Sequence, residues 1–188
     1  MAWRRLAIAL AAVSSLLALL AYGFYREPRY IYSRLIGKPA PSFELALFDG
    51  SRLRLADLRG KVVFVTFWSS WCPPCRAEAP ELEAAWQRFK DHDVVFVGIA
   101  IQDRREDALA FVREFNLSYP TGLDASGTIP INYGVWGIPE TFFIDREGVI
   151  TYKHVGTVGT ALIAAKVDEA RRNIISAGEG KGSYQSIR

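Results

Sequence analysis

Residues 62–75, VVFVTFWSSWCPPC, decide the fold. The first seven form a continuous apolar, β-branched and aromatic run, which predicts a central strand buried on both faces. Residues 73–90 follow with proline in the first turn and apolar side chains at helical spacing, so we expect a helix there. Cys72 and Cys75 therefore lie where a buried strand gives way to a helix.

This position gives Cys72 a reactive environment. The first amides of a helix have no partner inside the helix and point at this side chain, and together with the helix dipole they favour its thiolate. The thiolate is the species that attacks in disulfide exchange. Cys75, one turn into the helix, is close enough to attack the resulting mixed disulfide. The spacing predicts a nucleophile and a resolving thiol on one scaffold.

The rest of the chain alternates strand and helix patterns. In chain order they are a hairpin of residues 43–48 and 52–55 around Asp49-Gly50, a buried strand at 94–101, an amphipathic helix at 104–115, a hairpin of 141–145 and 149–153, and a final helix at 161–175. This order predicts an α/β fold with a mixed central β-sheet flanked by helices and an N-terminal β-hairpin.

The N-terminal segment, residues 1–25, has the pattern of a single transmembrane anchor. Residues 6–25 carry no charge, and a bilayer core needs about twenty such residues as a helix. A cleaved signal peptide is the main alternative, although its apolar region is usually shorter, and Leu19 fits poorly before the best cleavage site, after Ala21. A buried soluble helix is a third interpretation.

The segments after the anchor follow from this interpretation. Residues 26–37 are expected to be a linker, 38–175 the folded domain and 176–188 a flexible tail. An anchor and a signal peptide both imply export to a compartment that permits disulfide chemistry. With an anchor, the chain is a single-pass protein of the inner or cytoplasmic membrane, its domain facing the periplasm or exterior and its N-terminal helix contacting the lipid bilayer.

The composition is that of a globular protein, with 50% hydrophobic and 23% charged residues. The formal net charge is +3, from 23 basic and 20 acidic residues. Without Arg4 and Arg5 the count is 21 against 20, or +1. A domain so nearly neutral has no electrostatic reason to bind nucleic acid, and we expect none as a partner.

Two other uses of the cysteine pair are weaker hypotheses. A structural disulfide across so short a loop stabilises a protein by only about 2 kcal/mol. A zinc finger needs its second ligand pair roughly three to five residues apart, whereas His92 and His154 are 62 positions apart. We therefore expect no metal, no catalytic histidine and no cofactor beyond the redox-active pair itself.

The stretches FWSSWCPPC and GIPETFFID together resemble the thioredoxin superfamily. The similarity covers about residues 37–160 and is strongest to the exported, membrane-tethered branch that includes the ResA, TlpA and DsbE/CcmG types. The resemblance implies a thioredoxin-like fold, with Cys72 as the exposed nucleophile and Cys75 as the resolving thiol. It also implies that Pro139 is a cis-proline facing the dithiol, the alternative being a trans-proline in a loop.

The same resemblance implies a set of substrate contacts. Ile138 would offer its backbone to the substrate chain, and Trp71 would shield the dithiol and contact partners. The full expected substrate-binding set is Trp71, Pro73, Pro74, Ile138, Pro139 and Glu140. For Glu140 the alternative is an exposed acid at the start of a strand. Its Pro-Glu-Thr context favours the DsbE/CcmG type.

Two positions separate this chain from other branches of the superfamily. Cytoplasmic thioredoxins carry a buried Asp where this chain has Thr66. Glu78 instead matches an acid of the ResA and DsbE/CcmG types, one helical turn from Cys75, where it could take or give a proton. A solvated helix glutamate is the alternative. Peroxiredoxins need Pro and Thr where this chain has Val65 and Ser69, so peroxidase activity is not expected.

The sequence favours a reductant. The residues between the cysteines, Pro73-Pro74, include no histidine or other cation to stabilise the thiolate further, as strong oxidants require. The resemblance implies reduction of disulfides in exported proteins, above all apocytochrome c during cytochrome c maturation, with electrons from a membrane thiol relay. A general envelope thiol reductase, a disulfide-donating oxidase and a non-enzymatic tethered holdase or assembly factor remain as alternatives.

Overall fold

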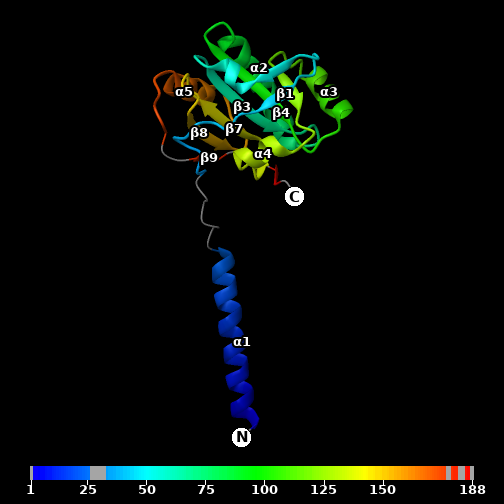
Figure 1. The fold of residues 1–188 in the computed structure, drawn as a ribbon. Coiled ribbons are helices and arrows are strands. Elements are labelled where there is room, and N and C mark those ends of the chain that lie inside the picture. Colours follow the sequence, from blue (N-terminus) through cyan, green and yellow to red (C-terminus); the bar gives the residue numbers. More distant parts are fainter. Residues whose placement is uncertain (1, 26–32, 177–178, 182–184, 187–188) are drawn as a thin grey trace. The chain divides into compact units, whose positions relative to one another are not determined.

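The structure, a computed structural model, describes residues 2–25, 33–176, 179–181 and 185–186 (Figure 1). The chain divides into two compact units, Met1–Ile31 and Tyr32–Arg188. The predicted linker 26–37 falls across this division, and its residues 26–32 lie outside the described part. Its last residues belong to the domain, because the Gly37 amide donates to the Ile150 carbonyl at 2.8 Å, and Leu35 and Ile36 pack against the core.

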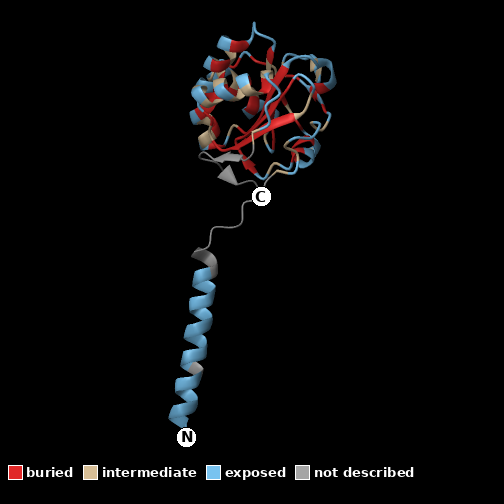
Figure 2. Ribbon diagram, turned by 90° about the vertical axis from the view of Figure 1, so that its left-hand side faces the viewer, coloured by how far each residue is buried: buried red, intermediate tan, exposed pale blue. Residues whose placement is uncertain are grey.

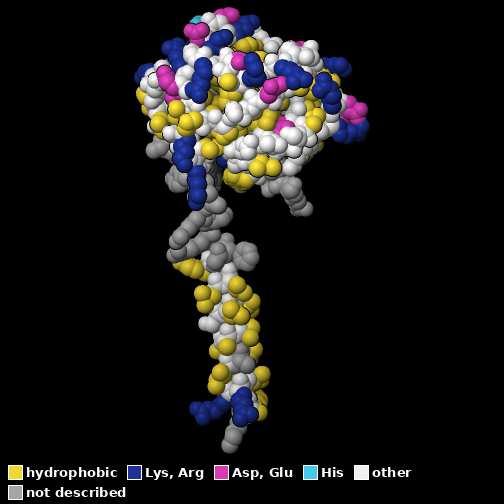
Figure 3. Space-filling view, in the orientation of Figure 1, with side chains coloured by type: hydrophobic (Ala, Val, Ile, Leu, Met, Phe, Trp, Pro, Cys, Tyr) yellow, Lys and Arg dark blue, Asp and Glu magenta, His cyan; other side chains and the backbone are white. Residues whose placement is uncertain are grey.

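The N-terminal unit contains the helix α1 (Ala2–Tyr25). Hydrophobic side chains cover it along its length, and two basic residues mark its N-terminal end (Figure 3). Residues Ala2–Tyr22 are long and apolar enough to cross a membrane, a test that a signal sequence also passes. The predicted helix is thus confirmed, and its length and composition fit an anchor and a signal peptide alike.

The second unit is built on a six-stranded sheet with the strand order β5-β4-β3-β7-β8-β9. The bounds are β3 (Val62–Trp68), β4 (Val94–Ala100), β5 (Thr121–Leu123), β7 (Glu140–Ile144), β8 (Ile150–Val155) and β9 (Glu179–Lys181). The central strand β3 pairs parallel with β4 and antiparallel with β7. The sheet is therefore mixed, as the sequence predicts.

Helices cover both faces of β3, which is buried along its whole length (Figure 2). Successive side chains of a strand point to opposite faces. On one face Phe64 stacks on Phe96, which contacts Trp86 of α2 (Pro73–Phe89). On the other, Phe67 packs against Tyr133 of α4 (Thr128–Tyr133). This two-sided burial explains the unbroken apolar run in the sequence.

The remaining elements complete the domain. They are the antiparallel hairpin of β1 (Glu44–Ala46) and β2 (Arg52–Arg54), the 3-10 helix η1 (Leu55–Leu58), α3 (Arg105–Glu114), β6 (Gly137–Ile138), α5 (Thr160–Arg171) and β10 (Gln185–Ser186). Both predicted hairpins are confirmed. The elements β5, α4 and β6 are absent from the sequence prediction because they are too short to show a period.

The last helix ends earlier than the pattern predicts. The expectation was 161–175, but α5 ends at Arg171. Asn173 takes a left-handed conformation, with φ of 54°, and the Ile174 amide donates to the Glu169 carbonyl at 2.9 Å. A left-handed residue with such a bond is a common helix stop, and asparagine tolerates it well.

The C-terminal segment also differs from a flexible tail without regular structure. Within 176–188 the structure contains β9, which pairs parallel with β8, and β10, which pairs antiparallel with β6. Both strands are held by backbone pairing to neighbours far away in the sequence. The local residue pattern therefore carries no sign of them.

Candidate active site

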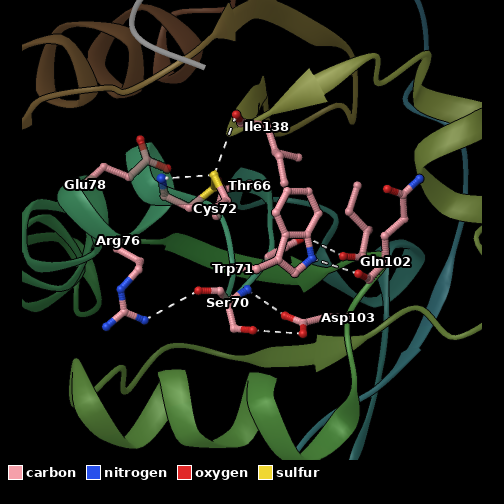
Figure 4. Close-up of a disulfide and its surroundings, with 12 residues drawn as sticks. Thr66, Ser70, Trp71, Cys72, Arg76, Glu78, Gln102, Asp103 and Ile138 are labelled. Carbon is pink, nitrogen blue, oxygen red and sulfur yellow. Dashed lines mark hydrogen bonds between the residues drawn. A yellow bond between two sulfur atoms is a disulfide. The ribbon is translucent and has the colours of Figure 1, made fainter. Parts of the chain in front are cut away.

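Cys72 and Cys75 form a disulfide at the N-terminus of α2, with their Cα atoms 5.3 Å apart. Cys72 is the N-cap residue, and its Sγ accepts a hydrogen bond from the Cys75 amide at 3.2 Å (Figure 4). Pro73 occupies the first helical turn, where its missing amide costs nothing. A free helix amide thus points at Cys72, as the sequence predicts, and this donor favours the thiolate once the bond is reduced.

The expected exposure of Cys72 is wrong in this disulfide form. Cys72 is 0% exposed and Cys75 1%. The Ile138 carbonyl oxygen lies 3.8 Å from Cys72 Sγ, so a second loop covers one side of the disulfide. The exposed residues of the motif are Trp71, at 46%, and Pro73. These are the parts of the motif that an approaching partner meets first.

The second loop carries the predicted proline. The peptide bond between Ile138 and Pro139 is cis, and both residues are buried. Ile138 lies in β6, whose backbone pairs antiparallel with β10 through Gln185, opposite Ile138, and Ser186, opposite Gly137. The strand edge expected to hold a substrate chain is therefore occupied here by the protein's own C-terminal residues.

Glu140 does not lie at the surface, so the alternative of an exposed strand-start acid is wrong. Its side chain is fully buried, and one oxygen accepts from the amides of Trp136 and Gly137, each at 3.0 Å. Its other oxygen forms an ion pair of 3.0 Å with Lys153, which is equally buried. Burial raises the pKa of Glu140, and the Lys153 ammonium and the two amides oppose that rise. Glu140 thus ties down the loop that leads into Pro139 and does not face a docked chain.

Glu78 is also buried, which excludes the solvated glutamate. It is 3% exposed on α2, and its carboxyl lies on the same side of the helix as the disulfide (Figure 4). One oxygen, Oε2, accepts from the Val158 amide at 3.0 Å, while Oε1 has no partner among the described residues. Burial raises the pKa of Glu78 to about 8, against the lowering effect of the Val158 amide. Glu78 is therefore suited to hold a proton at neutral pH beside Cys75.

Among the described residues, neither histidine forms a hydrogen bond with the cysteine pair, and Thr66, which lies near the disulfide, has no titratable group (Figure 4). His154 is buried against the Thr157 carbonyl at 2.9 Å, and burial lowers its pKa. His92 is exposed after the end of α2. Thr66, where cytoplasmic thioredoxins have Asp, is buried and lies 3.4 Å from the Thr141 hydroxyl. Across the described part of the chain, no three His, Cys, Asp or Glu side chains gather to hold a metal ion.

The sequence analysis did not predict three residues that contact the site. Lys153 neutralises Glu140 from the neighbouring strand β8. Gln102 and Asp103 contact the residues just before Cys72 from the end of β4. Nothing in their local spacing marks them, because strand pairing alone brings them to the site.

The site is a redox disulfide at a helix N-terminus, covered on one side by a loop with a cis-proline, in a domain built on a mixed six-stranded sheet between helices. These features define a thiol–disulfide oxidoreductase of the thioredoxin fold. The AhpC/TSA family model matches residues 36–153. The thiol:disulfide interchange protein DsbE of Pseudomonas fluorescens biotype C is 40% identical over 171 residues, which cover 85% of this chain and 94% of that protein. The chain therefore belongs to the AhpC/TSA family and, within the thioredoxin fold, to the DsbE-type thiol:disulfide interchange proteins.

More distant relatives agree with this assignment. The thiol-disulfide oxidoreductase ResA of Bacillus cereus is 32% identical over 121 residues, 64% of this chain and 70% of that protein. A crystal structure described as a DsbE-type thiol:disulfide interchange protein from Chlorobium tepidum superposes with a TM-score of 0.67 and 31% identity, over 71% of this chain and 96% of that one.

Proposed function

We propose that this thiol–disulfide oxidoreductase works as a reductase on disulfides of exported proteins. The observation that carries the proposal is the buried, uncharged acid Glu78 beside a cysteine pair whose intervening residues are both proline. No cation within the pair over-stabilises the thiolate, so the reduced form can give up its electrons.

The reaction runs through a mixed disulfide. The Cys72 thiolate attacks one sulfur of a substrate disulfide, which breaks that bond and releases the first substrate thiolate to take a proton. Cys75 then attacks Cys72 Sγ, forms the Cys72–Cys75 disulfide and releases the second substrate thiol. The substrate gains two electrons, and the cysteine pair loses two. A dithiol donor must return them.

Glu78 would manage the proton of Cys75 in both directions. In the disulfide form its raised pKa keeps it protonated at neutral pH. When a donor opens the disulfide, Cys75 leaves as a thiolate, and the proton of Glu78 can neutralise it. When Cys75 later attacks the mixed disulfide, the Glu78 carboxylate can take that proton back.

The docking mode that we propose is addition of a strand to β6. The pairing of β10 with this edge supports it, because an extended segment already fits antiparallel to Gly137 and Ile138. A substrate chain in the same place would run past the disulfide, since Ile138 O lies 3.8 Å from Cys72 Sγ. Trp71, Pro73 and Pro74 would then contact it from the other side, as the sequence predicts.

The cellular setting that we propose follows from α1. As an uncleaved single-pass anchor in the inner or cytoplasmic membrane, it would hold the domain on the periplasmic or outer side. The leading substrate is the cysteine pair of an apocytochrome c, with a membrane thiol relay as electron donor. A reporter active only outside the cytoplasm, fused after Arg188, should be active, and the full chain should resist extraction by high salt. Release of a soluble form beginning near Tyr22 would contradict the anchor.

The cysteine roles are tested by two substitutions. Cys72→Ser should abolish exchange and form no adducts, whereas Cys75→Ser should accumulate mixed disulfides because nothing resolves them. Adducts trapped through Cys75 in the Cys72→Ser variant would overturn the roles. The full-length chain should also accelerate insulin reduction by dithiothreitol, which a non-enzymatic holdase would not do.

The direction of electron flow and the peroxidase alternative need separate measurements. A reduction potential against glutathione well below that of disulfide donors would support a reductase, and a strongly oxidising value would favour the oxidase alternative. Consumption of hydrogen peroxide with dithiothreitol should not exceed the background rate, since Val65 and Ser69 replace the residues that peroxiredoxins use.

A further inference from the structure

The turn before Cys72 is tied to a second loop by contacts that the cysteine chemistry does not use. The paired strands β3 and β4 end at Trp68 and Ala100, and the Ile101 amide closes their ladder on the Trp68 carbonyl at 2.9 Å. Beyond this point the segment after β3 leads into α2, and the segment after β4 leads into α3. The segments that follow the two strands nevertheless stay joined. The Ser69 hydroxyl donates to the Ile101 carbonyl, and Ser70 and Trp71 form further bonds with the residues that follow Ile101.

Those further bonds define what we call the 102–103 brace, the contacts of Gln102 and Asp103 with Ser70 and Trp71. The Asp103 carboxylate accepts from the Ser70 amide at 2.6 Å and from the Ser70 hydroxyl at 2.9 Å. The Trp71 indole N–H donates to the Gln102 carbonyl at 2.9 Å. Figure 4 shows both contacts on the side of the motif opposite to Glu78.

The backbone of the brace is held in an unusual conformation. Gln102 has a φ of 48°, in the left-handed region that non-glycine residues rarely adopt. Such outliers persist where the surrounding contacts determine them, and they gather at functional sites. Here the conformation aims the Gln102 carbonyl at an indole ring that is nearly half exposed.

The exposure of Trp71 gives the brace a role. The disulfide beside it is buried, so a protein chain that approaches Cys72 meets this ring first. A large ring fixed in one orientation can contact a docking chain without losing rotational freedom on binding. A small disulfide can reach Cys72 without that contact.

We propose that Gln102 and Asp103 are positioning residues that hold Trp71 against a docking chain, and that they thereby set the preference of this enzyme for protein disulfides over small ones. The inference rests on the proposed function for its substrate class. The exchange chemistry at Cys72 and Cys75 does not depend on it.

The test compares insulin and glutathione disulfide as substrates of the full-length chain in detergent. Asp103→Ala should lower kcat/KM for insulin about tenfold, because it removes both hydrogen bonds that the carboxylate accepts from Ser70. Its reaction with glutathione disulfide should change by less than about twofold. Asp103→Asn keeps the shape and one acceptor oxygen, so it should recover part of the loss. Asp107→Ala removes a nearby exposed carboxylate that pairs with Arg104 and accepts no hydrogen bond from Ser70 or Trp71 in the described structure, and it should leave both rates unchanged.

A double-mutant cycle shows whether Asp103 acts through the ring. In a Trp71→Ala chain, Asp103→Ala should cause no further loss with insulin. Additive losses, equal losses on both substrates, or an unchanged substrate ratio in Asp103→Ala would each overturn the brace. A wild-type chain that reacts with glutathione disulfide but not with insulin would overturn the proposed function as well.

Discussion

Two buried glutamates flank the cysteine pair, and they differ in their partners. Glu78 lies on α2 with one amide donor and one oxygen without a partner among the described residues. Glu140 lies on β7 with two amide donors and the Lys153 ammonium. Burial raises the pKa of both carboxyls, but three donors oppose the rise at Glu140 and only one at Glu78. The arrangement at Glu78 suits a group that exchanges a proton. The arrangement at Glu140 suits a charged group that holds a loop in place.

The largest expected effect is on the buried ion pair of Glu140 and Lys153. Lys153→Met leaves the Glu140 carboxylate buried without its cation, and breaking such a pair costs about 3 to 5 kcal/mol of unfolding free energy. Urea denaturation followed by circular dichroism measures the loss. The double variant Lys153→Met/Glu140→Gln should recover part of it, because no unpaired charge remains. A loss below about 1 kcal/mol for Lys153→Met would show that the pair does not anchor the loop.

The second prediction concerns the proton of Glu78. Glu78→Gln keeps the shape and the acceptor for Val158 but cannot titrate. The step in which Cys75 resolves a mixed disulfide should slow at least about tenfold near neutral pH, and its pH profile should shift upward. Single-turnover kinetics of a preformed mixed disulfide measure this step. The rate of Cys72 alkylation serves as control and should change little. An unchanged profile would make Glu78 a structural group like Glu140.

The third prediction concerns stability against pH. The folded pKa of Glu78 is about 8, above its ordinary value of 4.5, so between these values the folded state of the disulfide form holds a proton that the unfolded state has lost. The free energy of unfolding should therefore fall as pH rises through this window, by about 1.4 kcal/mol per pH unit from this group alone. Glu78→Gln should remove that slope, so the variant should gain on the wild type between pH 6 and 8. Parallel stability curves would contradict the raised pKa.

The smallest expected effect is at the strand edge that Glu140 holds in place. Ending the chain after Lys181 removes β10 from β6 and keeps β9, and it should raise the rate with insulin about two- to threefold, because the edge no longer has to be vacated. Glutathione disulfide, which needs no strand pairing, should react at an unchanged rate. A slower reaction with insulin would show that these residues support the site and do not compete for it.

Local pattern predicts the elements whose residues report on their own surroundings. The run from Val62 to Trp68 is apolar on both faces, and the structure buries all seven residues. The turn signal at Asp49-Gly50 is followed by the expected pairing of β1 with β2. The position of Cys72 before a helix also follows from sequence, because a proline-initiated amphipathic pattern begins directly after it.

The prediction fails where pairing over long range decides the outcome. Strand pairing sets Thr141 opposite His154 and Phe142 opposite Lys153, and so brings the Lys153 ammonium to Glu140. The sequence separation of residues 140 and 153 does not indicate that both side chains are buried. Asp103 reaches Ser70 for the same reason, since β4 pairs with β3 and ends beside it.

The sequence by itself thus determined the class of fold, the place of the cysteine pair at the start of a helix, and the apolar N-terminal helix. These depend on periodicity and on neighbours within one helical turn, which the order of residues contains. Only the tertiary structure decided which acids are buried, which of them has a cation, and that the edge beside Cys72 is occupied. Burial and charge pairing are properties of the assembled sheet, where residues far apart in the chain share one environment.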